Sequence, residues 1–401
     1  MSARDMAGQE SLVKEVAALQ EELAALSELL FCSGILCEGR FRAQLHRRRF
    51  RRVLARFPLE AEGDLVNLQI AMNSRDIAAS VFAFVGFPVS GFRAGSKALS
   101  KSATPAELKA SSVGRLFVVG GESNGQYLAS AEVFNPDLDR WEDVPPMPSP
   151  RSFGAAASLR GKLYICGGSD GLQVTQRVVA YAPSSEEWTE MPAMVHRREG
   201  CGAASCNGLL VVAGGGDGVD LHISSECLNP ESGGCWMLLP NMEEARIGCA
   251  AVSLNGQVYV CGGCGRRGSL AIVDRYNSAE GQWEAVRPMR DARERFAAAV
   301  VHGFIYVCGG WLYGDPSARV LRSVERFDPH LGHWEDLAPM PQRRHGVAAA
   351  ALEGQLWVCG GSYGRQDVRT VEVYDVDTFA WVQMPSMHMP RNCASMAFVR
   401  F

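Results

Sequence analysis

The sequence predicts an all-β repeat protein of six four-stranded units, and three observations carry that prediction. An apolar strand ending in Gly-Gly occurs six times, and a Trp follows each pair about twenty residues later. Successive pairs are 47, 47, 48, 47 and 51 residues apart, a period that fits four short strands per unit. The pairs are Gly120 and Gly121, Gly167 and Gly168, Gly214 and Gly215, Gly262 and Gly263, Gly309 and Gly310, and Gly360 and Gly361; the tryptophans are Trp141, Trp188, Trp236, Trp283, Trp334 and Trp381.

Each unit reads as a meander of four strands, named a to d. Strand a is rich in small residues, as in 154–157, and a two-residue turn such as Asn207-Gly208 leads into the apolar strand b. Glycine tolerates the positive backbone angles that such a hairpin turn requires. Strand c follows, as in 371–374, and turn residues such as Asp328-Pro329 separate it from the strand d that carries the Trp.

The glycine pair, an aromatic residue three positions before it and the later Trp together resemble the Kelch repeat. Tyr164, Tyr259 and Tyr306 supply that aromatic residue, whereas Val211 makes the third unit the least typical. The resemblance covers about residues 111–401. It implies a six-bladed Kelch β-propeller of four-stranded antiparallel blades, in which the glycine pairs let blades pack closely near the axis and the tryptophans fill the space between neighbouring blades.

The two ends of the repeat region are complementary. Residues 101–110 contain no small-residue strand a for the first unit, whereas residues 391–399 read as a seventh strand a after the last unit. That C-terminal strand is expected to complete the blade begun by residues 114–144. Such closure removes the exposed edges that an open sheet must protect.

Residues 1–87 predict a short α-helical N-terminal region, and residues 88–110 read as a linker. Apolar residues at alternating steps of four and three indicate a heptad helix at about 10–31, which either joins two chains as a homodimer or packs on the next helix. The basic amphipathic segment 40–57 suits an acidic partner, a membrane surface, nucleic acid or a calmodulin-like groove, or is a solvated helix face. A third helix is expected at about 75–86, with a faint likeness to part of an F-box.

Composition and charge narrow the class of protein. No apolar run is as long as a membrane span and no signal peptide is evident, so a cytoplasmic location is expected, with a nuclear one left open by the Arg-rich segment. Residues 111–401 hold 24 arginines and one lysine against 32 acidic residues. This net acidic charge argues against nucleic acid as a partner of the propeller.

Cysteines repeat in one register directly before the glycine pair, at Cys166, Cys261, Cys308 and Cys359. A position repeated in every blade cannot easily form a disulfide with its neighbour, so we interpret it as a small buried residue. Cys264 completes a C-x-x-C motif that we attribute to strand register. Redox motifs of that kind lie at helix N-termini.

No motif in the sequence indicates catalysis. Metal-ligand spacing, a phosphate-binding glycine loop and a nucleophile in a recognised setting are all lacking, so neither an enzyme nor a cofactor or metal is expected. Some propellers with Kelch units are copper oxidases that gather Tyr, His and a cross-linked Cys at the axis. The histidines of this chain are scattered over its loops, which leaves a galactose-oxidase-like copper enzyme as a remote alternative.

The expected binding face follows from topology. Four strands of alternating direction place the b–c and d–a loops at one end of the propeller. The d–a loops carry Arg151, Arg198, Arg246, Arg293, Arg344 and Arg391, which either tie adjacent blades together or contact a partner. Arg295 stands two residues beyond this register, at an offset where Kelch adaptors that bind acidic peptides use arginines.

The b–c loops add aromatic and arginine side chains of the kind that dominate protein interfaces. They are Arg266, Arg267, Trp311, Tyr313, Tyr363 and Arg365. The sequence therefore predicts a non-enzymatic protein-interaction module that binds a protein partner, one with an acidic motif in the first hypothesis. As an adaptor it would act in ubiquitin-dependent protein turnover and bind a ubiquitin-ligase subunit. The alternative is a cytoskeletal scaffold that binds actin.

Overall fold

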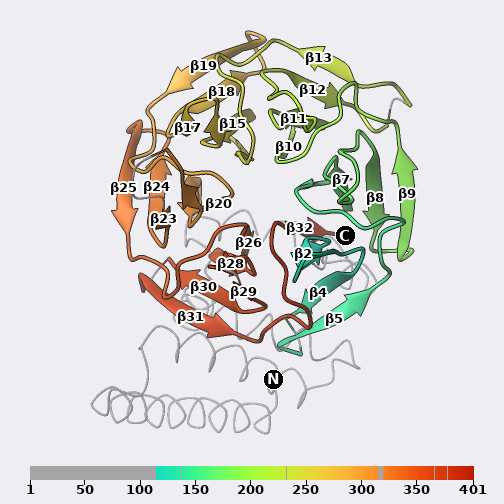
Figure 1. Ribbon diagram of the computed structural model, residues 1–401, viewed down its shortest axis with the longest axis vertical. Coiled ribbons are helices and arrows are strands. Elements are labelled where there is room, and N and C mark those ends of the chain that lie inside the picture. Colours follow the sequence, from blue (N-terminus) through green and yellow to red (C-terminus); the bar gives the residue numbers. More distant parts are fainter. Residues whose placement is uncertain (1–113, 137, 232, 315–318, 365, 377) are drawn as a thin grey trace, which may run out of the picture. The chain divides into compact units, whose positions relative to one another are not determined.

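The structure, a computed structural model, describes residues 114–401 except 137, 232, 315–318, 365 and 377. In that part of the chain six four-stranded antiparallel sheets form a ring around an axis, so the predicted six-bladed propeller is confirmed (Figure 1). Strand a of each blade lies innermost and strand d outermost.

Every blade has the same strand order. Blade one consists of β32 (Ser395–Arg400), β1 (Gly114–Val119), β4 (Ala131–Asn135) and β5 (Arg140–Val144); blade two of β6 (Ala155–Leu159), β7 (Lys162–Cys166), β8 (Val178–Ala182) and β9 (Glu187–Met191); blade three of β10 (Gly202–Cys206), β11 (Leu209–Ala213), β12 (Ser225–Leu228) and β13 (Met237–Leu239). Blade four consists of β14 (Ala250–Leu254), β15 (Gln257–Cys261), β18 (Val273–Asn277) and β19 (Gln282–Val286); blade five of β20 (Ala297–Val301), β21 (Phe304–Cys308), β24 (Val324–Asp328) and β25 (His333–Leu337); blade six of β26 (Ala348–Leu352), β27 (Gln355–Cys359), β30 (Val371–Asp375) and β31 (Ala380–Met384).

The N-terminal predictions lie outside the described residues. They are the helices at 10–31, 40–57 and 75–86 and the linker 88–110. The chain divides into two units, Met1–Ser111 and Ser112–Phe401, and the propeller is the second. None of the described residues belongs to a helix long and apolar enough to cross a membrane.

The C-terminal strand closes the ring, as predicted. Strand β32 pairs antiparallel with β1 over six residue pairs, from Gly114 opposite Arg400 to Val119 opposite Ser395. Blade one therefore combines strands from both ends of the propeller sequence. Its inner strand is the last to be synthesised.

Both glycines of each pair have positive φ and leave no room for a side chain. In blade two φ is 63° at Gly167 and 99° at Gly168. A Cβ at Gly167 would lie 2.2 Å from the carbonyl oxygen of Arg198 in the next blade's leading segment, and one at Gly168 would lie 2.7 Å from that of Ser152. The glycines thus permit the close packing near the axis that the Kelch resemblance implied.

The strand d tryptophans join neighbouring blades at the outer rim. Each indole Nε1 donates a hydrogen bond to a carbonyl oxygen of the preceding blade, over 2.8–2.9 Å. Trp188 of blade two, for example, donates to Pro145 beyond the end of blade one. The apolar clusters likewise span blade pairs, one of them holding Tyr164 of blade two with Leu210 of blade three.

The cysteines before the glycine pairs are buried and carry free thiols. Burial raises the pKa of the Cys261 thiol to about 12, so the thiolate form is disfavoured at neutral pH. Cys264 lies in a separate short strand, β16 (Cys264–Gly265), and has a free thiol. The four cysteines before the glycine pairs therefore act as small core side chains, as the sequence predicted, whereas Cys264 is only partly buried.

Candidate partner-binding face

The b–c loops and d–a segments lie at the same end of the propeller, as their topology predicted. Each d–a segment forms an antiparallel bridge to the b–c loop of its blade, for example Ser152 to Ser169 and Glu294 to Trp311. We define the upper face as the described residues of the b–c loops and of the d–a segments. The loops are 122–127, 169–174, 216–221, 264–269, 311–314 with 319–320, and 362–367 without 365; the segments are 151–153, 198–200, 246–248, 293–295, 344–346 and 391–393.

Four b–c loops form hairpins of two-residue strands that project from the blades. They are β2 (Glu122–Ser123) with β3 (Gln126–Tyr127), β16 (Cys264–Gly265) with β17 (Gly268–Ser269), β22 (Trp311–Leu312) with β23 (Arg319–Val320), and β28 (Ser362–Tyr363) with β29 (Gln366–Asp367).

Six backbone hydrogen bonds form a closed ring around the axis at the upper face. Each residue donates its N–H to the carbonyl of its counterpart in the preceding blade, over 2.6–3.1 Å. The ring residues are Phe153, Gly200, Gly248, Arg295, Gly346 and Cys393, and their φ angles lie between 50° and 68°. Because the ring fixes this left-handed backbone, the three members other than glycine hold an unfavourable conformation there.

The six arginines of the d–a loops are buried, which corrects the prediction that they contact a partner. The exposed fractions of Arg151, Arg198, Arg246, Arg293, Arg344 and Arg391 lie between 0 % and 3 %. Each backbone carbonyl accepts the N–H of the second glycine in the preceding blade, as from Gly168 to Arg198 at 2.7 Å. Each guanidinium donates hydrogen bonds to groups of its own blade, whereas its backbone carbonyl binds the preceding blade. Every one of these arginines therefore joins two blades.

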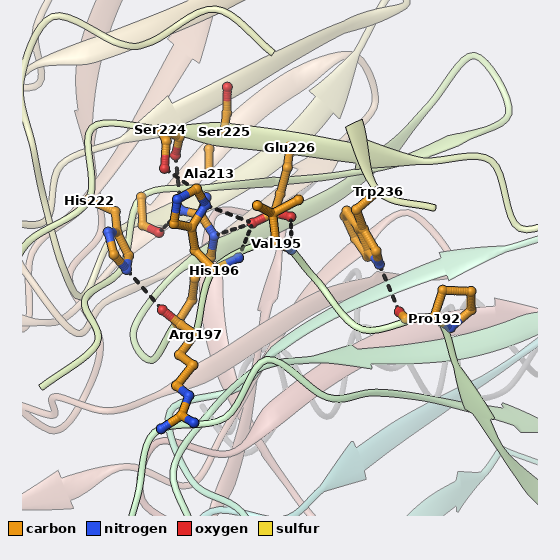
Figure 2. A network of polar contacts seen from close by, with 12 residues as sticks. Pro192, Val195, His196, Arg197, Ala213, His222, Ser224, Ser225, Glu226 and Trp236 are labelled. Carbon is orange, nitrogen blue, oxygen red and sulfur yellow. Dashed lines mark hydrogen bonds and ion pairs between the residues drawn. The ribbon is translucent and has the colours of Figure 1, made fainter. Parts of the chain in front are cut away.

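Blade three shows this arrangement in detail. Arg198 Nε donates to Oε1 of Glu226 at 2.8 Å, and Nη1 donates to the carbonyl oxygen of Gly214 at 2.7 Å. The carboxylate of Glu226 is itself buried and accepts the N–H of Val195 at 2.6 Å (Figure 2). These contacts satisfy a charge pair that is fully removed from water.

Strand c supplies such a carboxylate in five blades. The ion pairs are Arg198 with Glu226, Arg246 with Asp274, Arg293 with Glu325, Arg344 with Glu372, and Arg391 with Glu132. In blade two the same register position holds Val179, and among the described residues no carboxylate lies within ion-pair distance of Arg151. Burial lowers the pKa of that guanidinium.

Arg295 differs from these buried arginines because its side chain is partly exposed at the axis. Its guanidinium lies 5.0 Å from the ring centroid of Phe153. These residues belong to blades five and two, on opposite sides of the ring, so the side chain reaches across the axis. No carboxylate in the described part of the chain forms an ion pair with it. The upper face therefore presents at its centre an arginine that has no ion pair among the described residues.

A carboxyl and an imidazole are among the groups that interact with this cation. Glu199 is partly buried, and desolvation raises the pKa of its carboxyl while Arg295 acts in the opposite direction. His345 is buried, and desolvation followed by the charge of Arg295 lowers its pKa. His345 is therefore neutral at physiological pH, and the positive charge at the axis is that of Arg295.

Trp311 packs more deeply than the sequence predicted. Its ring is partly buried and lies 5.0 Å from the His345 ring, centroid to centroid. Its indole Nε1 is buried and has no hydrogen-bond partner among the described residues. Trp311 thus packs against the d–a segment of the next blade and is only partly accessible to solvent.

The remaining predicted contacts are exposed. Tyr313 is 59 % exposed and is held by its N–H, which donates to Ser269 Oγ at 2.8 Å, so it stands beside the hairpin that carries Arg266 and Arg267. Tyr363 is 58 % exposed on blade six. Arg365 lies outside the described residues.

Two exposed apolar side chains on this face escaped the sequence analysis. Leu172 is 94 % exposed and Val219 is 90 % exposed, each at the tip of a b–c loop. A signal was present: each follows an Asp-Gly pair, and the two positions are 47 residues apart, one repeat period. The predicted interface rested on arginine and aromatic residues, and aliphatic loop tips carry no such signal by residue type.

One cluster groups three side chains that can ligate a metal. Among the described residues, Glu132, Asp143 and His388 place ligand atoms within 4.8 Å of one another. Glu132 is occupied by Arg391 and by the N–H of His388 at 2.6 Å, and His388 Nδ1 is 3.0 Å from Asp143. The cluster contains neither Tyr nor Cys, so it does not match the copper site of the alternative enzyme.

Comparison with known families decides the classification. Six Kelch motifs match this chain, at residues 112–148, 150–195, 197–243, 245–290, 292–341 and 343–388. The chain belongs to the Kelch family. It is accordingly a six-bladed Kelch propeller.

Curated relatives share individual stretches of the Kelch propeller. Alpha-scruin of Limulus polyphemus is 32 % identical over 97 residues, covering 21 % of this chain and 11 % of scruin. Kelch-like protein 35 of Mus musculus is 40 % identical over 70 residues, 17 % of this chain and 12 % of that protein. The Mus musculus influenza virus NS1A-binding protein homolog is 53 % identical over 47 residues, 12 % and 7 % respectively. The matches thus span about a tenth of the length of these relatives.

A solved structure shares the fold. The structure of YjhT superposes with a TM-score of 0.56 at 17 % identity, over 67 % of this chain and 96 % of that one. At this identity the likeness concerns the arrangement of the blades alone.

Proposed function

We propose that this Kelch protein is a non-enzymatic recognition adaptor that binds a segment of a partner protein on its upper face. Arg295 carries the proposal. It is a partly exposed guanidinium at the centre of that face, and no described carboxylate pairs with it. Arginine binds carboxylates through two parallel hydrogen bonds, so an acidic side chain of the partner is the group that would complete this site.

The loops of the same face expose further side chains of the kinds that interfaces use. Tyr313 and Tyr363 are exposed aromatics, and Arg266 and Arg267 lie on the neighbouring hairpin. Aromatic and arginine side chains contribute most to binding free energy when they line a desolvated centre. The proposed contact set is therefore Arg295 with Arg266, Arg267, Tyr313 and Tyr363, without the six buried arginines.

A substrate receptor in ubiquitin-dependent turnover is the role we place first. Relatives named as Kelch-like proteins and one named for binding the influenza virus NS1A protein support recognition of another protein. Residues 1–87 would then recruit a ligase subunit or join two chains, and we propose a cytoplasmic or nuclear location for such an adaptor. An actin-bound cytoskeletal scaffold is the second candidate, favoured by the similarity to scruin.

The test is affinity purification of the full chain from cells, read by quantitative mass spectrometry. Arg295→Ala combined with Tyr313→Ala should remove the bound partner, because each change can cost about 2 kcal/mol at an interface hot spot. Arg140→Ala is the matched control, since Arg140 is an exposed arginine on β5 at the rim. Co-purified ligase subunits favour the first role, and actin favours the second. A partner retained by the double variant but lost with Arg140→Ala would contradict the proposal.

A further inference from the structure

The b–c loops give the upper face one acidic half, over blades one to three, and one basic loop, on blade four. The loops of blades one to three, residues 122–127, 169–174 and 216–221, carry four carboxylates and no lysine or arginine. The loop of blade four, residues 264–269, carries two arginines and no carboxylate. The described loop residues of blades five and six add one arginine, Arg319, and one carboxylate, Asp367. Arg295 lies at the axis. The face is therefore acidic over blades one to three and basic at blade four and at the axis.

Apolar side chains project from the acidic half. Leu172 and Val219 are almost fully exposed at the tips of adjacent loops, and those loops touch each other, since a Cβ at Gly218 would lie 3.7 Å from Val174. Tyr127 extends this line on blade one, because a Cβ at Gly171 would lie 2.9 Å from its ring. We call Tyr127, Leu172 and Val219 the apolar ridge.

Backbone hydrogen bonds fix both the ridge and the charges beside it. Asp170 Oδ1 accepts the N–H of Leu172 at 2.9 Å and that of Gln173 at 2.8 Å. Asp217 Oδ1 binds the N–H of Val219 and Asp220 over the same distances. These bonds hold the pKa of both carboxyls below the ordinary value, so they remain ionised. A loop tip held in one conformation loses little conformational entropy when it is bound.

We propose that the upper face recognises a partner segment whose charge changes sign along its length. Apolar residues flanked by Lys or Arg would lie on the ridge, beside Asp170, Asp217 and Asp220, and Asp or Glu would lie over Arg266, Arg267 and Arg295. This inference rests on the proposed function, because it requires the upper face to be the receptor. A uniformly acidic segment would meet like charges over blades two and three, which disfavours it and sets the orientation of the bound segment.

The probe is a library of random twelve-residue peptides displayed on phage and selected on the immobilised full chain. Enriched peptides should contain an acidic group and, separated from it, a basic residue next to a large apolar one. The affinity of an enriched synthetic peptide is then measured by fluorescence anisotropy. Leu172→Ser combined with Val219→Ser should weaken the peptide's affinity about tenfold or more, because the apolar contact is lost. The turns themselves should persist, since Asp170 and Asp217 bind backbone N–H groups. Asp220→Lys should weaken the affinity about as much by placing a cation opposite the peptide's basic residue.

Leu331→Ser is the matched control, because Leu331 is a large exposed aliphatic residue, 71 % exposed in the c–d turn of blade five at the opposite end. It should leave the affinity unchanged. Failure to enrich any peptide, or enrichment of purely acidic peptides that bind the ridge variants normally, would overturn the inference. If Arg295→Ala weakens binding while the ridge variants do not, the proposed function stands and the ridge is dispensable. If Arg295→Ala is also silent, the upper face itself has been misassigned.

Discussion

Blades two and three bury the same arginine in different surroundings. In blade three Arg198 pairs with Glu226, and its side-chain bonds measure 2.7–3.0 Å. In blade two Arg151 reaches only carbonyl and hydroxyl oxygens, at 3.3–3.4 Å, and Val179 stands in place of the carboxylate. A buried charge destabilises a fold unless a partner compensates for its lost hydration. The residue on strand c, and not the repeated arginine, therefore decides whether the buried arginine position stabilises a blade.

Removal of the closing segment should have the largest effect. A chain truncated after Pro390 loses β32, which exposes the inner edge of β1, and it leaves the buried carboxylate of Glu132 without Arg391. We expect aggregation or loss of the cooperative unfolding transition, measured by light scattering and differential scanning calorimetry. Deletion of Phe401 alone is the control and should preserve the transition. A truncated chain that melts cooperatively at the parent temperature would disprove closure by β32.

Arg198→Met isolates the paired site of blade three. It leaves the buried carboxylate of Glu226 without its guanidinium and with only the imidazole of His196, 3.8 Å away, as a basic neighbour. The free energy of unfolding should therefore fall by about 3–5 kcal/mol. Urea unfolding at neutral pH measures this change. Adding Glu226→Gln should recover part of the loss, because the stranded charge is removed as well. A loss below about 1 kcal/mol would mean that the pair is not desolvated as the structure shows.

Arg151→Met is the matching change in blade two and should be much milder. No described carboxylate is stranded by it, and the lost hydrogen bonds are long, so we expect the free energy of unfolding to fall by about 1 kcal/mol or less. The same urea titration gives the value. Equal losses at Arg151 and Arg198 would show that their hydrogen bonds to backbone carbonyls, and not the ion pair, determine stability.

The smallest effect concerns the rim beside these arginines. His388 of blade one and Val195 of blade three occupy the same position, and the backbone N–H of each donates to the strand c carboxylate of its blade. Only His388 has a side chain that can also hydrogen-bond, and its ring binds Asp143. The hydrogen bond to Asp143, aided by the charge of Glu132, raises the pKa of His388 above 6.5. The contribution of His388 to stability is therefore complete at pH values below its pKa in the unfolded chain. It is lost as the pH rises through its higher pKa in the folded protein.

Because His388 and Asp143 are largely exposed, this contribution should be below about 1 kcal/mol. Urea midpoints at about pH 6 and about pH 8 should differ more for the parent than for His388→Gln, in the direction of lower stability at high pH. An unchanged difference in the variant would assign the pH dependence to other groups.

Much of the fold could be predicted because its signals are periodic. The glycine pairs and tryptophans recur at fixed intervals, and the small-residue strand after Arg391 completes blade one. Each signal reflects a steric requirement that every blade must meet. Such requirements leave the same residue at the same position and are therefore visible in one sequence.

The site was less predictable because its decisive contacts are not periodic in the same way. The carboxylate that pairs with Arg198 lies 28 residues later on strand c, and only the structure shows that this distance brings the two groups together. The same spacing separates Arg246 from Asp274, so the pattern could have been found by searching for a recurrent Arg–acid interval. The exposure of Leu172 depends on a turn that Asp170 stabilises, and aliphatic residues carry no such signal by themselves.

The pairing of β32 with β1 has a consequence for protein engineering. Gly114 lies opposite Arg400, so the two ends of the propeller are neighbours and a short linker can join them. The ring could then be opened at the a–b turn of blade five, where a Cβ at Gly303 would meet nothing within 4 Å. The closed ring thus does not depend on which blade comes first in the polypeptide, and a circularly permuted chain is expected to fold into the same propeller.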